Sequence, residues 1–388
     1  MTENADLVIV GGGPVGAALA LALQDSGLDV LALEARPAES AALVAVDERP
    51  LALSHGSRLI LERLGVWPAL CSPTPIARIH VSHAGGFGHV RLDARATGLP
   101  AYGYVVPYGE LVRVMTQAVA QRIPRYRLGA RATALQVEGT TAVVEYTREG
   151  GVTDSAAAPL IVVADGGSLA AEADLQIRDY GQTAVTARVA AELRHEGTAY
   201  ERFTPEGPLA LLPMGSEMAL IWTTTPERAA ELAAMPEAAF LAALQKQFGN
   251  RLGRFRGAGA RSVYPLVLKY AHHAVLPRTV LIGNAAQTLH PVAGQGFNLG
   301  LRDAWELAEE IAASEPEWLG QPDMLERVRR KRRLDRRGSI AFTDFLVRLF
   351  SNDRLPVRFA RGMGLALLDQ LPLAKNFLAR RMTFGARG

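Results

Sequence analysis

A glycine-rich run near the N-terminus has the residue types and spacing needed to hold a dinucleotide. It contains G-x-G-x-x-G and lies between an apolar strand expected over Asp6–Val10 and a helix expected over Pro14–Asp25. Glycine lets the backbone turn sharply and approach a pyrophosphate, and the helix presents unpaired N–H groups and its positive dipole end to that anion. The predicted contacts are Gly11, Gly13, Pro14, Val15 and Gly16.

An acidic residue follows the second expected strand at the distance that a ribose contact requires. Glu34 comes directly after the apolar run Val30–Leu33, close to the spacing of about twenty residues that this arrangement uses. Its carboxylate can accept hydrogen bonds from ribose hydroxyls and would repel a 2′-phosphate. The site is therefore predicted to take FAD or NAD and not NADP, with Ala35 and Arg36 as neighbouring contacts.

A second glycine-rich loop near the C-terminus favours FAD over a nicotinamide cofactor. Residues 283–300 follow an apolar strand expected over Val280–Ile282 and lead into a helix expected from Gly296 to Ala313. A helix N-terminus suits a flavin, because reduced flavin carries negative charge at its N1–C2=O edge. Asp165-Gly166 closes another strand and is expected to add polar contacts. The predicted contacts within the loop are Asn284, Pro291, Gly294, Gly296, Phe297 and Asn298.

On these residues, the chain resembles the class A FAD-dependent aromatic monooxygenases, which include p-hydroxybenzoate hydroxylase. Within that group it is similar to the ubiquinone-biosynthesis hydroxylases over nearly its whole length. Two departures from the broad family, Asn284 for the usual Asp and Gln287 for a frequent His, resemble the subgroup that acts on a prenylated 6-methoxyphenol. Besides both glycine-rich segments, the resemblance rests on Asp47–Ser54, Asp165-Gly166 and Tyr180–Ala184.

The resemblance implies an enzyme that uses FAD, with NADH or NADPH as transient reductant and O2 as co-substrate. Reduced flavin would capture O2 as a C4a-hydroperoxide and hydroxylate the aromatic ring of a prenylated phenol in ubiquinone biosynthesis. Arg49 is implied to contact the flavin nucleotide. No catalytic residue is assigned. His290 is the candidate for a polar group that assists removal of the phenol proton, although simple packing beside Pro291 is favoured for it.

Two other functions stay open. One is a hydroxylase of a soluble phenol, or another flavin reductase of the same fold, and an apolar tunnel beside the flavin would argue against it. The other is a non-catalytic flavin-binding scaffold subunit of a ubiquinone-biosynthesis complex, a hypothesis that Asn284 and Gln287 raise. A metal site at His80 and His83 is excluded, because residues three apart in a strand point to opposite faces.

The order of patterns along the chain indicates an α/β fold built from discontinuous segments. Blocks of alternating strand and helix pattern bracket blocks that are typical of antiparallel sheet. We expect a Rossmann-like FAD-binding domain, similar to that of p-hydroxybenzoate hydroxylase, from residues 1–75, 101–180 and 270–325. An inserted β-sheet substrate domain would comprise residues 76–100 and 181–269, and residues 326–388 would form a helical C-terminal region.

Composition restricts the cellular setting. Hydrophobic residues make up 49% and charged residues 21% of the 388 residues, which is typical of a globular enzyme. The net charge of +3 gives no indication of nucleic-acid binding. Cys71 is the single cysteine and cannot form an internal disulfide, which fits the cytoplasm. We expect neither a signal peptide nor a membrane-spanning segment.

The C-terminal region mixes basic and apolar residues in a pattern that leaves two roles open. Eight Lys and Arg residues crowd the stretch between Arg327 and Arg337, and Leu and Phe alternate with Arg from Ile340 onward. The basic stretch is either a solvated helix face or a contact with an anionic surface. The apolar positions either pack on the core or lie peripherally on the inner face of the cell membrane, where a prenylated phenol would dissolve.

Overall fold

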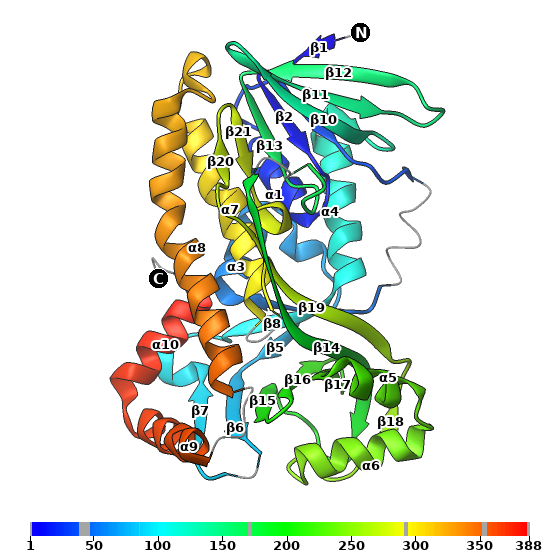
Figure 1. The fold of residues 1–388 in the computed structure, drawn as a ribbon, viewed down its shortest axis with the longest axis vertical. Helices are drawn as coiled ribbons and strands as arrows, with labels where there is room; N and C mark the ends of the chain where they lie inside the picture. The colour runs from blue at the N-terminus through cyan, green and yellow to red at the C-terminus, as the bar shows by residue number, and fades with distance from the viewer. Residues whose placement is uncertain are drawn as a thin grey trace.

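The computed structural model describes residues 2–38, 47–84, 86–169, 173–290, 294–350 and 355–385. Pro291, a predicted cofactor contact, lies outside these residues. A parallel sheet with helices on one face lies toward one end of the molecule, and a large antiparallel sheet lies toward the other (Figure 1). The C-terminal helices run along one side and reach both parts. The predicted fold class is confirmed.

The parallel sheet forms the core of the dinucleotide domain. Its order is β20-β21-β13-β2-β3-β9, and all pairs except β20–β21 are parallel. The central strands are short apolar runs that are buried on both faces, as parallel strands usually are. The strands are β2 (Leu7–Val10), β3 (Val30–Leu33), β9 (Arg125–Arg127), β13 (Leu160–Val163), β20 (Val275–Leu276) and β21 (Thr279–Leu281).

Alternate residues of these strands belong to two different cores. Leu7 and Ile9 pack against the helices α1 (Pro14–Ala22), α4 (Tyr108–Arg122) and α7 (Gln295–Ala312). Val8 and Val10 pack against a smaller four-stranded sheet on the other face. That sheet has the order β1-β12-β11-β10 and consists of β1 (Thr2–Asn4), β10 (Arg131–Glu138), β11 (Thr141–Thr147) and β12 (Thr153–Ala158).

The large antiparallel sheet is built mainly from the segment after β13. Its order is β22-β19-β14-β17-β16-β15-β6-β7, with β18 beside β14, and β6–β15 is its parallel pair. Helices α5 (Pro226–Ala234) and α6 (Glu237–Phe248), which the sequence did not predict, cover one face. The strands are β6 (Arg78–His83), β7 (His89–Asp93), β14 (Leu175–Ala191), β15 (Thr198–Thr204), β16 (Gly207–Met214), β17 (Glu217–Thr224), β18 (Phe255–Ala258), β19 (Ser262–Ala271) and β22 (Gln287–Thr288).

The long strands β14 and β19 run past the expected domain boundaries at residues 181 and 269. They pair from Leu175↔Ala271 onward. The antiparallel sheet therefore begins within segments that the sequence analysis assigned to the FAD-binding domain. A three-stranded sheet joins the two parts, in the order β4 (Pro50–Ser54), β8 (Gly103–Pro107) and β5 (Thr74–Ile76). Helix α3 (His55–Arg63) follows β4, and the Ser54 hydroxyl caps it by accepting from the Ser57 N–H at 3.1 Å.

The C-terminal region is helical, as expected, and consists of α8 (Pro322–Phe350), α9 (Leu355–Gln370) and α10 (Pro372–Phe384). Buried ion pairs join α8 to α7. Arg302 donates from Nε to Asp335 at 2.7 Å, and Arg332 donates from Nε to Asp303 at 2.8 Å. Burial disfavours the charge on Arg332, but Asp303, Glu306 and Asp335 outweigh it and raise the pKa of this guanidinium above its usual value.

Neither role considered for the basic stretch between Arg327 and Arg337 describes it fully. Arg332 is buried, and Arg336 donates from Nε to the side-chain Oε1 of Gln287 at 2.9 Å. Arg327 and Lys331 pair with glutamates of α7 at 2.6 and 2.9 Å. Much of this charge therefore fastens α8 to the dinucleotide domain. Within the described residues, no helix combines the length and hydrophobicity needed to cross a bilayer.

Removing one member of the buried ion pairs is expected to destabilise the protein strongly. Asp335→Ala leaves Arg302 buried without its partner, which costs about 3–5 kcal/mol in unfolding free energy. Urea unfolding followed by circular dichroism measures this change. The control is Glu326→Ala on the exposed face of α8, which should leave the midpoint nearly unchanged. Equal midpoints for both variants would contradict the anchoring role of Asp335.

Candidate active site

A continuous cavity of about 1150 Å³ extends from the glycine-rich turn after β2 to the C-terminal helices. Its wall at one end carries Gly13, Glu34, Arg49, Asp165 and Asn284. Further along, the wall consists of one face of the antiparallel sheet and of apolar side chains from α8, α9 and α10. Residues that are more than two hundred positions apart in the sequence thus border one space.

The glycines of the first turn have different structural roles. Gly11 has φ +105°, a conformation that favours glycine. A Cβ on Gly16 would overlap the Gly11 carbonyl oxygen, so this glycine allows α1 to pack closely on the turn. Gly13 has φ −60°, is the N-cap of α1 and borders the cavity. Apart from its two neighbours in the chain, no atom of the described residues lies within 4 Å of where its Cβ would be. The open space at Gly13 is where a pyrophosphate could approach the N–H groups of α1.

Glu34 is held in a defined orientation at the end of β3. Its Oε2 accepts from the Gly12 N–H at 2.7 Å, and its Oε1 accepts from the N–H and Nε of Arg36 at 2.9 and 2.8 Å. Nearby, burial and then the charge of Glu34 raise the pKa of Tyr126 to about 12, so this phenol stays neutral. Glu34, Ala35 and Arg36 all line the cavity, as expected for residues beside a ribose.

Arg49 borders the same end of the cavity from the segment before β4. Its guanidinium carbon lies 4.8 Å from the ring centre of Tyr108 and 5.5 Å from that of Tyr264. The hydrogen bond to Asp47 raises the pKa of Arg49, despite partial burial. The side chain is thus fixed as a cation at the cavity edge, where a phosphate could meet it.

Asp165 and Asn284 line the cavity from neighbouring loops. The Asp165 carboxylate accepts from the N–H groups of Gly167 and Leu169 at 2.8 and 3.0 Å, which closes the turn after β13. Asn284, in the position where the family usually has Asp, is exposed in the cavity wall. Its amide can both donate to and accept from a polyhydroxyl chain.

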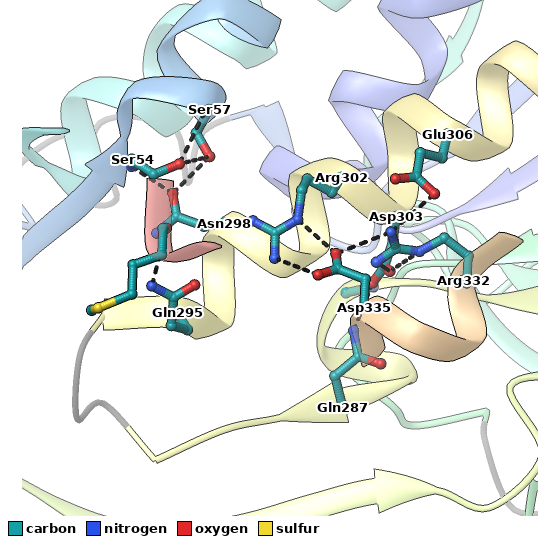
Figure 2. Close-up of polar contacts among 12 residues, drawn as sticks. Ser54, Ser57, Gln287, Gln295, Asn298, Arg302, Asp303, Glu306, Arg332 and Asp335 are labelled. Atoms are coloured by element: carbon teal, nitrogen blue, oxygen red, sulfur yellow. Dashed lines mark hydrogen bonds and ion pairs between the residues drawn. The ribbon is translucent and has the colours of Figure 1, made fainter. Parts of the chain in front are cut away.

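Gln287, the other departure from the family pattern, connects two buried charges. Its Nε2 donates to Asp303 at 2.6 Å, and both residues are drawn in Figure 2. Its Oε1 accepts from Arg336 at 2.9 Å. An amide can fill both roles at once because it has a donor and an acceptor. Gln287 therefore couples the loop after β21 to α7 and α8.

The Asn298 side chain uses its hydrogen-bonding capacity on the protein itself. Its Oδ1 accepts from the Ser54 N–H at 2.8 Å and the Ser57 hydroxyl at 2.6 Å, and its Nδ2 donates to the carbonyls of Ala52 and Gly294 at 2.9 and 2.6 Å. Asn298 thus ties the start of α7 to β4 and α3 (Figure 2). Asn298 could therefore contact a cofactor only through its backbone. Its neighbours Gly294, Gly296 and Phe297 line the cavity.

His290 does not border the cavity, although Thr288 and Leu289 do. It is buried edge-on against Tyr180, with ring centres 5.7 Å apart. Burial lowers its pKa to about 4, so the ring is neutral near pH 7. This environment agrees with packing, the role favoured from the sequence, and not with an acid–base role. In the described part of the chain, no three His, Cys, Asp or Glu side chains are grouped to hold a metal ion.

Sequence reasoning missed the wall that the antiparallel sheet contributes. Glu201 stands between Ala199 and Phe203 on the same face of β15, and all three line the cavity. Alternation in Thr198–Thr204 was the available signal, because it places this glutamate on an otherwise apolar face. Composition and motifs alone gave no reason to single it out.

Comparison with known proteins agrees with this geometry. A family model described as FAD binding domain matches residues 4–341. The chain is 37% identical to ubiquinone hydroxylase UbiL of Rhodospirillum rubrum, covering 97% of this chain and 89% of the relative. It is 32% identical to 3-demethoxyubiquinol 3-hydroxylase of Escherichia coli, covering 96% and 97%. The chain belongs to the FAD-dependent ubiquinone hydroxylase family.

A solved structure supports the same fold. The p-nitrophenol 4-monooxygenase PnpA of Pseudomonas putida matches with a TM-score of 0.78 and 18% identity, over 100% of both chains. The open space at Gly13, the oriented Glu34 carboxylate and the Arg49 guanidinium together fit a dinucleotide with a pyrophosphate. The residues present therefore suit FAD, the cofactor of the family.

Gly13 and Gly16, three residues apart in the chain, distinguish cofactor contact from packing. Gly13→Ala should fold normally and weaken FAD binding roughly ten- to hundredfold, because its Cβ enters only the cavity. Gly16→Ala should instead lower the unfolding free energy of the cofactor-free protein by about 1–3 kcal/mol, because its Cβ meets backbone. Fluorescence titration with FAD and thermal unfolding measure the two effects. Unchanged FAD affinity in Gly13→Ala would contradict the proposed pyrophosphate position.

Proposed function

We propose that this protein is an FAD-dependent monooxygenase that hydroxylates the aromatic ring of a prenylated phenol in ubiquinone biosynthesis, with NADH or NADPH and O2. The observation that carries the proposal is the cavity, which begins at the dinucleotide fingerprint and ends among apolar side chains. A substrate with a polar ring and a long hydrocarbon tail matches a cavity with one polar and one apolar end. The two relatives described above, from Rhodospirillum rubrum and Escherichia coli, are ubiquinone hydroxylases.

The polar end offers a separate group for each part of FAD. The N-terminus of α1 at Gly13 would bind the pyrophosphate, Glu34 would accept from the ribose, and Arg49 would pair with phosphate. The start of α7 at Gly294–Phe297 would direct its positive dipole end to the flavin ring, with Asn284 at the ribityl chain. Bound FAD supplies the oxygen-transfer chemistry, and the protein orients the ring and excludes water.

The apolar end has the composition needed for a hydrocarbon chain. Leu365 and Leu368 of α9 and Leu378 and Met382 of α10 line it. Phe345 of α8 also lines the cavity, and 56% of its surface is exposed. This exposure favours an opening of the cavity to the surface beside Phe345. Such a tunnel argues against a small soluble phenol as the substrate. The more specific similarity to hydroxylases of a 6-methoxyphenol stays a prediction.

Turnover with a prenylated phenol tests the function directly. The purified protein should carry a flavin absorption spectrum, oxidise NADH or NADPH faster when 2-farnesylphenol is present, and release a product heavier by one oxygen atom. The short-chain control is phenol, which should stimulate oxidation much less because it leaves the apolar end empty.

Each contrary outcome of this assay has a defined meaning. Stimulation by phenol equal to that by 2-farnesylphenol would favour a hydroxylase of a soluble substrate. Bound FAD without NAD(P)H oxidation in the presence of any prenylated phenol would favour the scaffold-subunit hypothesis. A protein that cannot be reconstituted with FAD would contradict the whole proposal.

We further propose that α9 and α10 bring the tunnel to an anionic membrane surface. The two helices have inward apolar residues at the cavity and a second set of apolar residues facing outward, while Arg380 is also exposed. Partly buried apolar helices with basic neighbours favour binding in the interface plane. The outward set is Phe359, Met363, Leu367, Leu371, Leu373 and Phe377. A protein partner in a ubiquinone-biosynthesis complex would compete for the same patch.

Vesicle binding tests the membrane contact. The double variant Leu373→Ser/Phe377→Ser removes side chains that are 86% and 69% exposed, so it should sediment with phosphatidylglycerol vesicles at least roughly tenfold more weakly. Ile177→Ser, at an exposed position on β14, is the control and should bind like the unaltered protein. If the unaltered protein does not sediment with vesicles, the patch is assigned to a protein partner instead.

A further inference from the structure

One carboxylic acid stands on the otherwise apolar sheet face that borders the cavity. Glu201 of β15 lies directly across from Val81 of β6 and Ala210 of β16. Beyond these neighbours, Val81 pairs with Val90 and Ala210 pairs with Ile221. All five residues line the cavity. Because cross-strand partners share a face of the sheet, Glu201 is at the centre of an apolar row.

The residues adjacent to Glu201 in the chain point to the opposite face. Tyr200 packs edge-on against Phe248 of α6 with ring centres 5.4 Å apart, and Arg202 donates from Nε to the Gln247 carbonyl at 2.8 Å. The Arg202 guanidinium is therefore directed away from the Glu201 carboxyl. Among the described side chains of α9, that of Arg361 carries a charge and lines the apolar part of the cavity.

The Glu201 carboxyl is not satisfied by the described protein atoms. Its Oε1 is buried and has no hydrogen-bond partner there. Burial raises the pKa of Glu201 to about 7, and no nearby charge contributes to this rise. A carboxylate oxygen that is buried without a partner is costly, so a sequence selected only for stability would place an apolar residue here.

We propose that Glu201 binds the phenolic hydroxyl of the substrate, accepting its hydrogen bond and so fixing which ring position faces the flavin. The inference rests on the proposed function, since it requires a phenol in the cavity. The hydroxyl would supply the partner that Oε1 lacks, while Val81, Ala210 and Ile221 contact the ring. A carboxylate that accepts from a phenol also increases electron density on the ring, which favours attack by electrophilic oxygen.

A pair of ligands that differ only in the hydroxyl tests this role without turnover. We would titrate the FAD-loaded protein with 2-farnesylphenol and with farnesylbenzene, and follow the change in the flavin absorption spectrum. The unaltered protein should bind the phenol roughly ten- to hundredfold more tightly, as expected for a hydrogen bond to a charged acceptor. Glu201→Gln should reduce this ratio and Glu201→Leu should abolish it, with the affinity for farnesylbenzene unchanged or improved.

The dependence on pH adds a readout that a structural role would not give. Since the ionised carboxyl is the stronger acceptor, the affinity for the phenol should rise as pH increases through about 7, and Glu201→Gln should flatten this profile. The raised pKa also means that Glu201 destabilises the folded protein more as pH increases from its usual value of 4.5 to about 7. Glu201→Leu should therefore raise the unfolding temperature more at pH 8 than at pH 5, while Glu145→Gln on the exposed face of β11 should not.

The outcomes separate this inference from the proposed function. Equal affinity of the unaltered protein for the two ligands, or a Glu201→Leu variant that keeps the ratio, would overturn the role of Glu201 even if the phenol is hydroxylated. A ratio that depends on Glu201 without any hydroxylated product would support this role and contradict the proposed activity. A lower unfolding temperature for both Glu201 variants would assign the residue to structure and overturn the inference.

Discussion

The arrangement of this protein depends on helix α7 being fixed at two points along its length. Near its start, Asn298 makes four hydrogen bonds that hold it to β4, α3 and the preceding loop. About one turn later, Arg302 and Asp303 enter ion pairs with Asp335 and Arg332 of α8. Buried charges are tolerable only when they are paired in good geometry. The ion pairs therefore restrict how α7 and α8 can be placed relative to each other.

This constraint links the cofactor end of the cavity to its apolar end. The Asp303 carboxylate also accepts from the Gly283 N–H at 3.2 Å and from Gln287, so the loop carrying Asn284 is set by the same residues. Through α8, the ion pairs also position the helices that close the apolar end. A substitution in this cluster is therefore expected to affect cofactor loop and tunnel together, although none of its ion pairs borders the cavity.

The antiparallel sheet supplies the remaining wall through simple alternation. Leu211 and Leu220 point to α5 and α6 and form a closed core, while Ala210 and Ile221 point to the cavity. A shift of register by one residue would exchange these faces and bury Glu201 in the core. The small side chain of Ala210 leaves room beside Glu201, and the apolar surroundings make that carboxyl responsive to a single hydrogen-bond donor.

The sequence by itself determined the parts of the protein that depend on local pattern. The fingerprint from Gly11 to Gly16 with Glu34, and the short apolar strands, could be predicted because turn chemistry and burial on both faces leave a direct signature. Helix ends were predicted less accurately: α1 stops at Ala22, three residues before the expected Asp25.

Only the tertiary structure decided which side chains meet the cavity. The cofactor contact predicted for Asn298 concerns its backbone, and the sequence gave no sign that its side chain would bind Ser54 and Ser57, which are more than two hundred positions away in the sequence. Arg332 was expected on a solvated helix face or in contact with an anionic surface, yet it is buried against Asp303. Glu201 belongs to no sequence motif. Its surroundings come from β6 and β16, the strands that pair with β15 on its two sides. Long-range pairing of this kind depends on the folded geometry, whereas glycine turns and apolar strands depend on residues that are neighbours in the chain.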